Sequence, residues 1–197
     1  MLWFFLRIVY RTQMNTITEQ YLKEQVKLHE NPVYGVASVG FASRVAHLIN
    51  HLSPKTLTDY GAGKKYLKKA LDHLGVTNYR YQPFDPAFPI YGEALEADLV
   101  CCIDVLEHVE PPFLDNVLLD LVRVTKMAGF ITVHTGPAQK HLSDGRNAHL
   151  IQKPLSWWLP KLKQFFEVGV IERHEGTGEG FSLVIGRKNF FYITDKF

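Results

Sequence analysis

A β-rich run passes directly into a glycine turn at Thr56-Leu57-Thr58-Asp59-Tyr60-Gly61-Ala62-Gly63-Lys64. The run ends in an acidic residue, two glycines follow one residue apart, and a helical pattern over 64–74 begins at once. Glycine lets the backbone bend sharply and lets a ligand approach where a Cβ would otherwise stand. The stretch therefore predicts a strand, a tight turn and a helix N-terminus, which is where an open α/β sheet binds a nucleotide-like cofactor.

The spacing of the glycines disfavours a dinucleotide cofactor. A nicotinamide-binding turn has a third glycine three positions after the second, and this chain has Tyr66 there. The acid also precedes the glycines instead of ending the next strand. Asp-x-Gly-x-Gly after a first strand resembles motif I of the class I S-adenosylmethionine (SAM)-dependent methyltransferases.

A second motif strengthens this resemblance. Residues 97–104 form a continuous apolar run with Asp104 at its end, which predicts a buried strand, and 129–134 predict another. The string Asp104-Val105-Leu106-Glu107-His108-Val109 is similar to the fourth-strand motif of many SAM methyltransferases. The resemblance covers roughly residue 56 to the C-terminus.

The resemblance implies an α/β fold, a three-layer Rossmann-like sandwich with a mostly parallel sheet of about six to seven strands. Members of this class end in an antiparallel strand pair. Here 166–173 and 181–188 are β-patterned runs joined by the glycine-rich segment 174–180, which predicts a hairpin. The segment 87–96 is irregular, so we expect the third strand to be short or absent.

Length and composition indicate one soluble globular domain. The chain has 197 residues, of which 46% are hydrophobic and 21% charged, and its net charge of +2 gives no argument for nucleic acid. Cys101 and Cys102 are adjacent in a predicted strand, so they point to opposite faces and cannot form an ordinary disulfide. Core packing in a reducing cytosol is the expectation for both, and with it a cytoplasmic location.

We divide the domain into an apolar extension (1–13), N-terminal helices (14–55) and the SAM-binding part (56–197). The extension is too short to span a bilayer and lacks a signal-peptide pattern. We expect Met14 to be the natural start and no stable membrane insertion; a weak peripheral membrane contact is the alternative. A helix capped by Thr16 or Thr18 and a second over 38–52 are predicted, and the resemblance implies that they cover the cofactor.

The resemblance implies a set of cofactor-binding residues from the two motifs: Asp59, Tyr60, Gly61, Ala62, Gly63, Asp104 and Val105. Members of the class usually have an acid at the end of the second strand, whose two oxygens accept hydrogen bonds from the ribose hydroxyls. Where we expect that acid, this chain has Gln82, and Asp85 from the following loop is the candidate replacement.

The candidate catalytic residues are His108, Glu107 and His149. His108 follows the fourth-strand motif and is the first candidate for a base that takes the proton of a hydroxyl or ammonium acceptor; a histidine that only fixes the loop is the alternative. Asp104, Glu107 and His108 come together if this segment makes a helical turn. Carboxylate and imidazole suit Mg²⁺ or Mn²⁺, so Glu107, His108 and His149 form a candidate metal site. The pattern is similar to the metal site of small-RNA 2′-O-methyltransferases.

The acceptor-side clues lie in 143–158. Arg146, Asn147 and His149 can hydrogen-bond a polar or anionic acceptor, and Ser156 is predicted to cap a helix over 156–166. Trp157 and Trp158 face about 100° apart on that helix, so we expect only one of them in the core. Base methylation of DNA is disfavoured, because the fourth strand lacks both the Asp/Asn-Pro-Pro-Tyr/Phe motif and the Pro-Cys nucleophile of those enzymes.

These observations predict a SAM-dependent methyltransferase acting on an oxygen or nitrogen of a small, metabolite-like acceptor. The alternatives are a metal-assisted RNA or nucleotide O-methyltransferase and a non-catalytic SAM-fold binding or regulatory protein. The acceptor itself and the oligomeric state cannot be read from the sequence.

Overall fold

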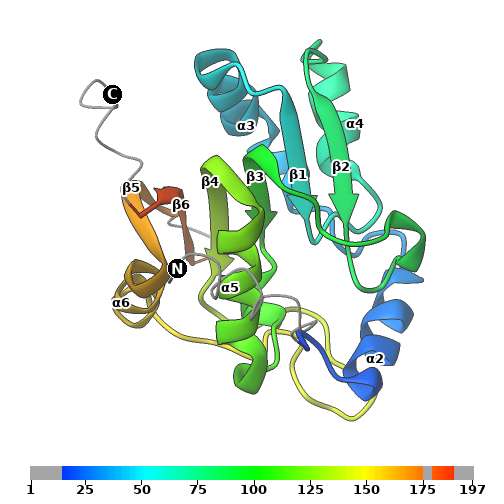
Figure 1. The fold of residues 1–197 in the computed structure, drawn as a ribbon. Helices are drawn as coiled ribbons and strands as arrows, with labels where there is room; N and C mark the ends of the chain where they lie inside the picture. Colours follow the sequence, from blue (N-terminus) through cyan, green and yellow to red (C-terminus); the bar gives the residue numbers. More distant parts are fainter. Residues whose placement is uncertain (1–14, 175–178, 189–197) are drawn as a thin grey trace, which may run out of the picture.

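The computed structural model describes residues 15–174 and 179–188 of the chain. One sheet of six strands has the order β2-β1-β3-β4-β6-β5 (Figure 1). The strands β1 to β4 are parallel, and β6 pairs antiparallel with both β4 and β5, which confirms the predicted fold class. The strands are β1 (Thr56–Tyr60), β2 (Arg80–Phe84), β3 (Ala97–Ile103), β4 (Thr125–His134), β5 (Phe166–His174) and β6 (Gly180–Arg187).

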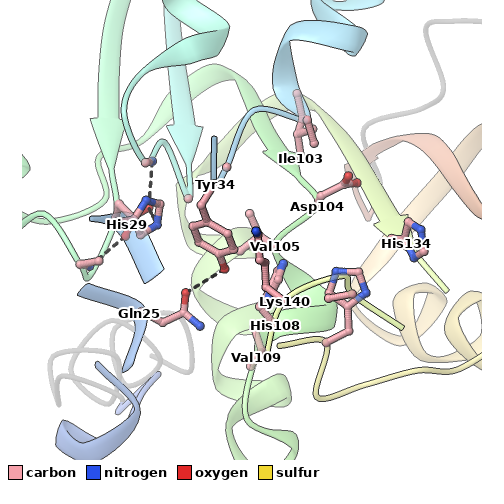
Figure 2. A pocket seen from close by; sticks show the side chains of 18 of the residues that line it. Gln25, His29, Tyr34, Ile103, Asp104, Val105, His108, Val109, His134 and Lys140 are labelled. Atoms are coloured by element: carbon pink, nitrogen blue, oxygen red, sulfur yellow. Dashed lines mark hydrogen bonds and ion pairs between the residues drawn. The ribbon is translucent and has the colours of Figure 1, made fainter. Parts of the chain in front are cut away.

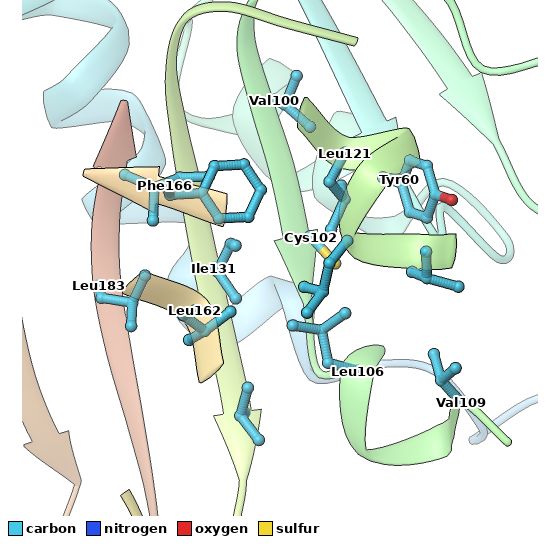
Figure 3. Packing of buried hydrophobic residues seen from close by; sticks show 14 of the residues in the cluster. Tyr60, Val100, Cys102, Leu106, Val109, Leu121, Ile131, Leu162, Phe166 and Leu183 are labelled. Carbon is cyan, nitrogen blue, oxygen red and sulfur yellow. The ribbon is translucent and has the colours of Figure 1, made fainter. Parts of the chain in front are cut away.

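Helices cover both faces of this sheet. On one face α3 (Ser38–Leu52) and α4 (Tyr66–His73) pack over Leu57, Leu99 and Phe130. On the other face α5 (Leu114–Val124) and α6 (Leu155–Phe165) bury a larger cluster, in which Leu162 and Phe166 lie against Ile131 (Figure 3). The apolar alternation of the strands and the apolar stripes of the helices thus give three layers.

The connection from β2 to β3 is short. It contains one 3-10 turn, Pro89–Tyr91, and no strand pairs with the outer edge of β2 within the described part of the chain. Among residues 87–96, where we expected a short strand or none, the structure has this 3-10 turn and no strand. Pro83 in β2 has no N–H to donate, which fits an edge strand.

Several local predictions can be compared with the structure. Thr18 caps α2 (Glu19–His29), its hydroxyl accepting a hydrogen bond from Tyr21 N at 3.1 Å, and α3 has the predicted bounds. Trp158 is fully buried whereas Trp157 is 39% exposed, as expected. The predicted cap at Ser156 is wrong, because α6 begins at Leu155 and the carbonyl of Pro154 accepts the first N–H groups.

Cys101 and Cys102 are buried free thiols in β3. None of the helices in the described ranges combines the length and apolar character needed to cross a bilayer. The predictions on the extension 1–13 and on most of the connection 174–180 lie outside the described residues.

Candidate functional site

A cavity of about 650 Å³ lies at the carboxyl ends of β1, β2 and β3. Parallel strands end at the same edge, so side chains that follow different strands meet there. Figure 1 shows α2 beyond this edge, next to the ends of the strands. The cavity is therefore bounded by the sheet on one side and by the N-terminal helix on another.

The glycine turn forms one wall of the cavity. The N–H groups of Gly61 and Ala62 both donate to the carbonyl of Phe84, at 2.7 and 2.9 Å, and so close the turn onto β2. Gly61 has φ +82°, and a Cβ there would stand 2.3 Å from a methyl carbon of Val105. Only glycine fits this position, because the backbone conformation and the contact with Val105 both exclude a side chain.

Three carboxylates line the cavity, one after each of three adjacent strands: Asp59 (at the end of β1), Asp85 (after β2) and Asp104 (after β3). Asp85 accepts hydrogen bonds from Gly63 N at 2.9 Å and from Ala87 N at 2.8 Å. Each oxygen keeps a further lone pair, so the carboxylate can hold the turn and still accept from a ligand hydroxyl.

Asp104 has the left-handed φ of +50°, which is strained for a residue with a side chain. Thr132 of β4 holds it there: Asp104 N donates to Thr132 Oγ1 at 2.9 Å, and that hydroxyl donates to Asp104 Oδ1 at 2.5 Å. The left-handed residue turns the chain out of β3, and Val105 then packs on Gly61. The two sequence motifs are thus in direct contact.

Asp59 is buried, and burial raises the pKa of its carboxyl to about 7, although the Tyr81 hydroxyl, 2.5 Å away, opposes the rise. Of the other residues predicted from motif I, Tyr60 and Gly63 line the cavity, whereas Ala62 does not. The Tyr60 hydroxyl donates to Asp120 within the core, so its side chain points away from the cavity.

The structure places Gln82 away from the cavity. Strand β2 continues to Phe84, so position 82 lies inside the strand and not at its end. The buried amide of Gln82 donates to Thr58 Oγ1 at 3.0 Å and to the carbonyl of Glu96 at 3.3 Å. The expected position of the acid after the second strand was therefore wrong, and Asp85 occupies the place beyond the strand end.

Three histidines form a second wall of the cavity: His108, His134 and His149. The rings of His108 and His149 are nearly perpendicular with centroids 4.7 Å apart, and His134 lies 4.9 Å from His149. Figure 2 shows His108 and His134 with Asp104 and Tyr34 around the cavity.

Their hydrogen bonds determine which nitrogen carries the proton. His108 Nδ1 lies 2.8 Å from the carbonyl of Ala148, and His149 Nδ1 lies 2.8 Å from the carbonyl of Gly136. A carbonyl only accepts, so both Nδ1 atoms are donors and both Nε2 atoms carry lone pairs in the neutral rings. Burial lowers the pKa of His108 to about 3 and lowers that of His149 as well, so both rings are neutral at pH 7.

Glu107 does not line the cavity, although it belongs to the same 3-10 turn, Leu106–His108, as His108. Its carboxylate is fully buried and accepts a hydrogen bond from His134 N at 2.7 Å. Burial raises the pKa of the Glu107 carboxyl well above its usual range. The carboxylate points into the protein and supports the end of β4.

The candidate metal site of Glu107, His108 and His149 has no support. Within 15–174 and 179–188, no three His, Cys, Asp or Glu side chains are arranged to hold a metal ion. The reason is that the Glu107 carboxylate is turned toward β4, while the two imidazoles face the cavity.

Helix α2 and the loop after it cover the site. Gln25 and Tyr34 are joined by a hydrogen bond of 3.2 Å, and both line the cavity (Figure 2). The Tyr21 hydroxyl donates to the carbonyl of His108 at 2.6 Å, and the Lys64 ammonium donates to the carbonyls of Asn31 and Tyr34. The cover is therefore attached to both walls of the cavity.

The loop after β4 contributes fewer of its predicted residues than expected. His149 lines the cavity, whereas Arg146 pairs with Asp144, and Asn147 braces the loop through Ala138 and the N–H of His149. Trp157 lies on α6 and is not part of the lining.

Sequence reasoning missed His29 and His134. His29, the last residue of α2, packs against Gly63 and lies 4.0 Å from the Asp85 carboxylate, a contact that no local pattern reveals. His134 had a signal, because it is a polar residue at the end of an apolar strand, as Asp59 and Asp104 are.

The fold resembles methyltransferases of known structure. A Burkholderia thailandensis 1,6-didemethyltoxoflavin-N1-methyltransferase, solved with its substrate and S-adenosylhomocysteine, superposes with a TM-score of 0.60 at 14% identity, over 88% of this chain and 91% of the other. The mitomycin 7-O-methyltransferase superposes with a TM-score of 0.62 at 16% identity, over 85% of this chain and 60% of the other. Human N-acetylserotonin methyltransferase with bound SAM superposes with a TM-score of 0.51 at 13% identity, over 75% of this chain and 51% of the other.

These similarities show that the chain has the Rossmann-like fold of class I methyltransferases. It spans only 60% and 51% of the second and third proteins. No family model matches the sequence, and no curated protein matches it either.

Proposed function

We propose that this chain is a SAM-dependent methyltransferase that methylates an oxygen or nitrogen of a small acceptor. The observation that supports the proposal most is the meeting of the glycine turn with the carboxylates after β1, β2 and β3 at one cavity. Two methyltransferases with this fold have been solved with S-adenosylhomocysteine or SAM bound, which supports the same proposal.

The residues present fit the cofactor. Gly61 lets Val105 pack directly on the turn, which brings the two motifs together at the cavity. Asp85 is the residue we assign to the ribose hydroxyls, because a carboxylate accepts from two hydroxyls and this one follows β2. Asp104 supplies negative charge beside a cationic ligand. Val105 and the apolar side chains around it exclude water from the same space.

The cofactor supplies an electrophilic methyl group on a sulfonium, and the chain's task is to hold and deprotonate the acceptor. Holding two reactants in line is a large part of such catalysis. We assign His108 and His149 to the acceptor proton, because each has a neutral ring that lines the cavity and an Nε2 lone pair not used by its Nδ1 contact. Glu107 acts only through the backbone that it holds.

Titration calorimetry with S-adenosylhomocysteine and SAM tests the cofactor. We expect one site per chain with micromolar affinity for both ligands. No heat at millimolar ligand would contradict the proposal. Binding without any methyl transfer from labelled SAM to metabolite, RNA or protein extracts would favour the non-catalytic alternative.

The metal-assisted alternative depended on a cluster of three metal ligands, and the described residues hold no such cluster. The same labelled extracts test it directly. Transfer to RNA that disappears on chelation would restore it, and transfer to the small-molecule fraction that survives chelation would exclude it.

A further inference from the structure

The hydrogen-bonding pattern of the histidine wall restricts which acceptors the proposed function can use. His108 and His149 each donate through Nδ1 to a backbone carbonyl, so each neutral ring has its acceptor nitrogen, Nε2, left over. Within residues 15–174 and 179–188, the side-chain hydrogen bonds of both rings are made through Nδ1. The two rings that carry these acceptor nitrogens are nearly perpendicular, with centroids 4.7 Å apart.

The charged side chains nearest in sequence to His108 are bonded to other groups. Glu110, two residues after His108, has its two carboxylate oxygens held by the N–H and the hydroxyl of Thr18, each at 2.8 Å. Glu107 is turned into the core.

Lys140 is the single lysine or arginine among the described lining residues, and its side chain is exposed. Asp104 and Glu179 also line the cavity, but Asp104 is assigned to the cofactor and Glu179 is exposed. The wall therefore has no buried cation for an anionic acceptor and no buried carboxylate left for a cationic one.

The remaining surface near the wall suits a flat ring. The edge of Tyr34 faces His108 with centroids 6.1 Å apart, and Val105, Val109 and Val117 also line the cavity. Aromatic and branched apolar side chains bind planar apolar surface well. A cavity of about 650 Å³ that also holds a nucleoside cofactor has room for a small acceptor only.

We propose that the methyl acceptor is a small, uncharged aromatic compound that carries ring hydroxyls, with hydrogen-bond donors on adjacent positions pointing at Nε2 of His108 and of His149. This inference rests on the proposed function and names the substrate class of the same site. In the transfer step the acceptor oxygen forms a bond to the methyl carbon, the sulfonium C–S bond breaks, and the hydroxyl proton goes to an imidazole Nε2. The products are a methyl ether, a neutral thioether and an imidazolium that returns its proton to water.

The test compares the binding of simple aromatic probes to the full chain saturated with S-adenosylhomocysteine. The probes are 1,2-dihydroxybenzene, phenol, 1,2-dimethoxybenzene, benzoate and benzylammonium. We expect the dihydroxy probe to bind most tightly, phenol a few-fold to about tenfold more weakly, and the dimethoxy probe more weakly again, since each step removes a hydrogen bond. Benzoate or benzylammonium binding as tightly as the dihydroxy probe would overturn the inference.

Matched variants connect the result to the two nitrogens. His108→Asn and His149→Asn keep a donor at the place of Nδ1 and remove Nε2, so each should reduce the preference for the dihydroxy probe over phenol to about none. His73→Asn, at the exposed end of α4, is the control and should leave the preference unchanged. Thermal unfolding of each variant verifies that it is folded.

The outcomes separate this inference from the proposed function. S-adenosylhomocysteine binding with no preference among the probes overturns the inference and leaves the proposed function standing. Failure of S-adenosylhomocysteine to bind overturns the proposed function, and the role of an aromatic compound as methyl acceptor is then overturned with it.

Discussion

The two halves of the cavity are built in different ways. The cofactor half comes from two short motifs, each a strand end and the turn after it, and these touch through Gly61 and Val105. The acceptor half combines α2, the turn after β3, the end of β4 and a loop more than ten residues farther on, held by contacts such as Tyr21 to His108 and Glu107 to His134. Changes in the first half should affect cofactor binding, and changes in the second should affect the acceptor and leave the cofactor bound.

The largest effect is expected at the contact of the two motifs. Gly61→Ala puts a Cβ 2.3 Å from Val105, in a conformation that costs a side chain about 1–2 kcal/mol. We expect at least a hundredfold weaker S-adenosylhomocysteine binding, measured by calorimetry. Gly75→Ala is the matched control, because Gly75 has φ +75° with no atom near its Cβ position. Equal affinities for the two variants would mean that the turn does not hold the cofactor.

The next effect concerns Asp85. Asp85→Ala removes the acceptor of the Gly63 and Ala87 N–H groups and the assigned ribose contact together. Hydrogen bonds to a charged group contribute about 1.5–3 kcal/mol, so we expect a loss of about ten- to a hundredfold in cofactor affinity. The control is Asp72→Ala, which removes an exposed carboxylate on α4 that pairs with Lys68. Unchanged affinity in Asp85→Ala would remove this residue from the cofactor half.

A change at Glu107 tests whether its hydrogen bond to His134 N positions the acceptor half of the cavity. Glu107→Leu leaves His134 N–H without its acceptor, which costs about 1–3 kcal/mol of unfolding free energy, whereas Glu107→Gln retains an accepting oxygen. We expect Glu107→Leu to weaken aromatic probe binding and to leave cofactor affinity within a few-fold. Urea unfolding and calorimetry measure the two effects. A Gln variant as damaged as the Leu variant would argue against this positioning role.

The raised pKa of the Glu107 carboxyl adds a pH dependence to the same pair. Between the unfolded pKa, near 4.5, and the higher folded pKa, the native chain binds more protons, so stability falls as pH rises. The Glu107→Gln variant has no carboxyl to titrate, so it does not lose stability in this way. We therefore expect the stability of Glu107→Gln relative to the natural chain to rise between pH 5 and pH 8 in urea unfolding. A constant difference would contradict burial of a protonated Glu107.

The titration of His108 adds a second pH dependence. Its folded pKa of about 3 lies below the usual 6.5, so at intermediate pH the unfolded chain binds more protons and stability falls as pH falls from 6.5 toward 3. His29 and His149 have lowered pKa values and act in the same direction. His108→Asn should make this fall shallower, measured as melting temperature against pH. An unchanged slope would mean that His108 is more exposed to water than the structure has it.

Much of the fold was predictable because its signals are local. The runs that became β3 and β4 are mostly apolar and lead to the polar residues Asp104 and His134, and α3 follows a helical spacing over its whole length. The position of Gln82 was mispredicted because the end of β2 depends on pairing with β1, where Tyr60 and Phe84 are still partners. Ser156 was mispredicted as a cap because the preceding Pro154 carbonyl already starts the helix.

The sequence by itself determined the sheet, its glycine turn and the acids after β1 and β3, since spacing along one segment dictates which residues reach a strand end. Only the tertiary structure decided which way Glu107 points, that His29 lies on Gly63, and that the rings of His108 and His149 meet nearly at right angles. Those facts depend on burial and on hydrogen bonds between segments far apart in the chain. Such contacts form only after the layers have packed, so no local pattern in the sequence specifies them.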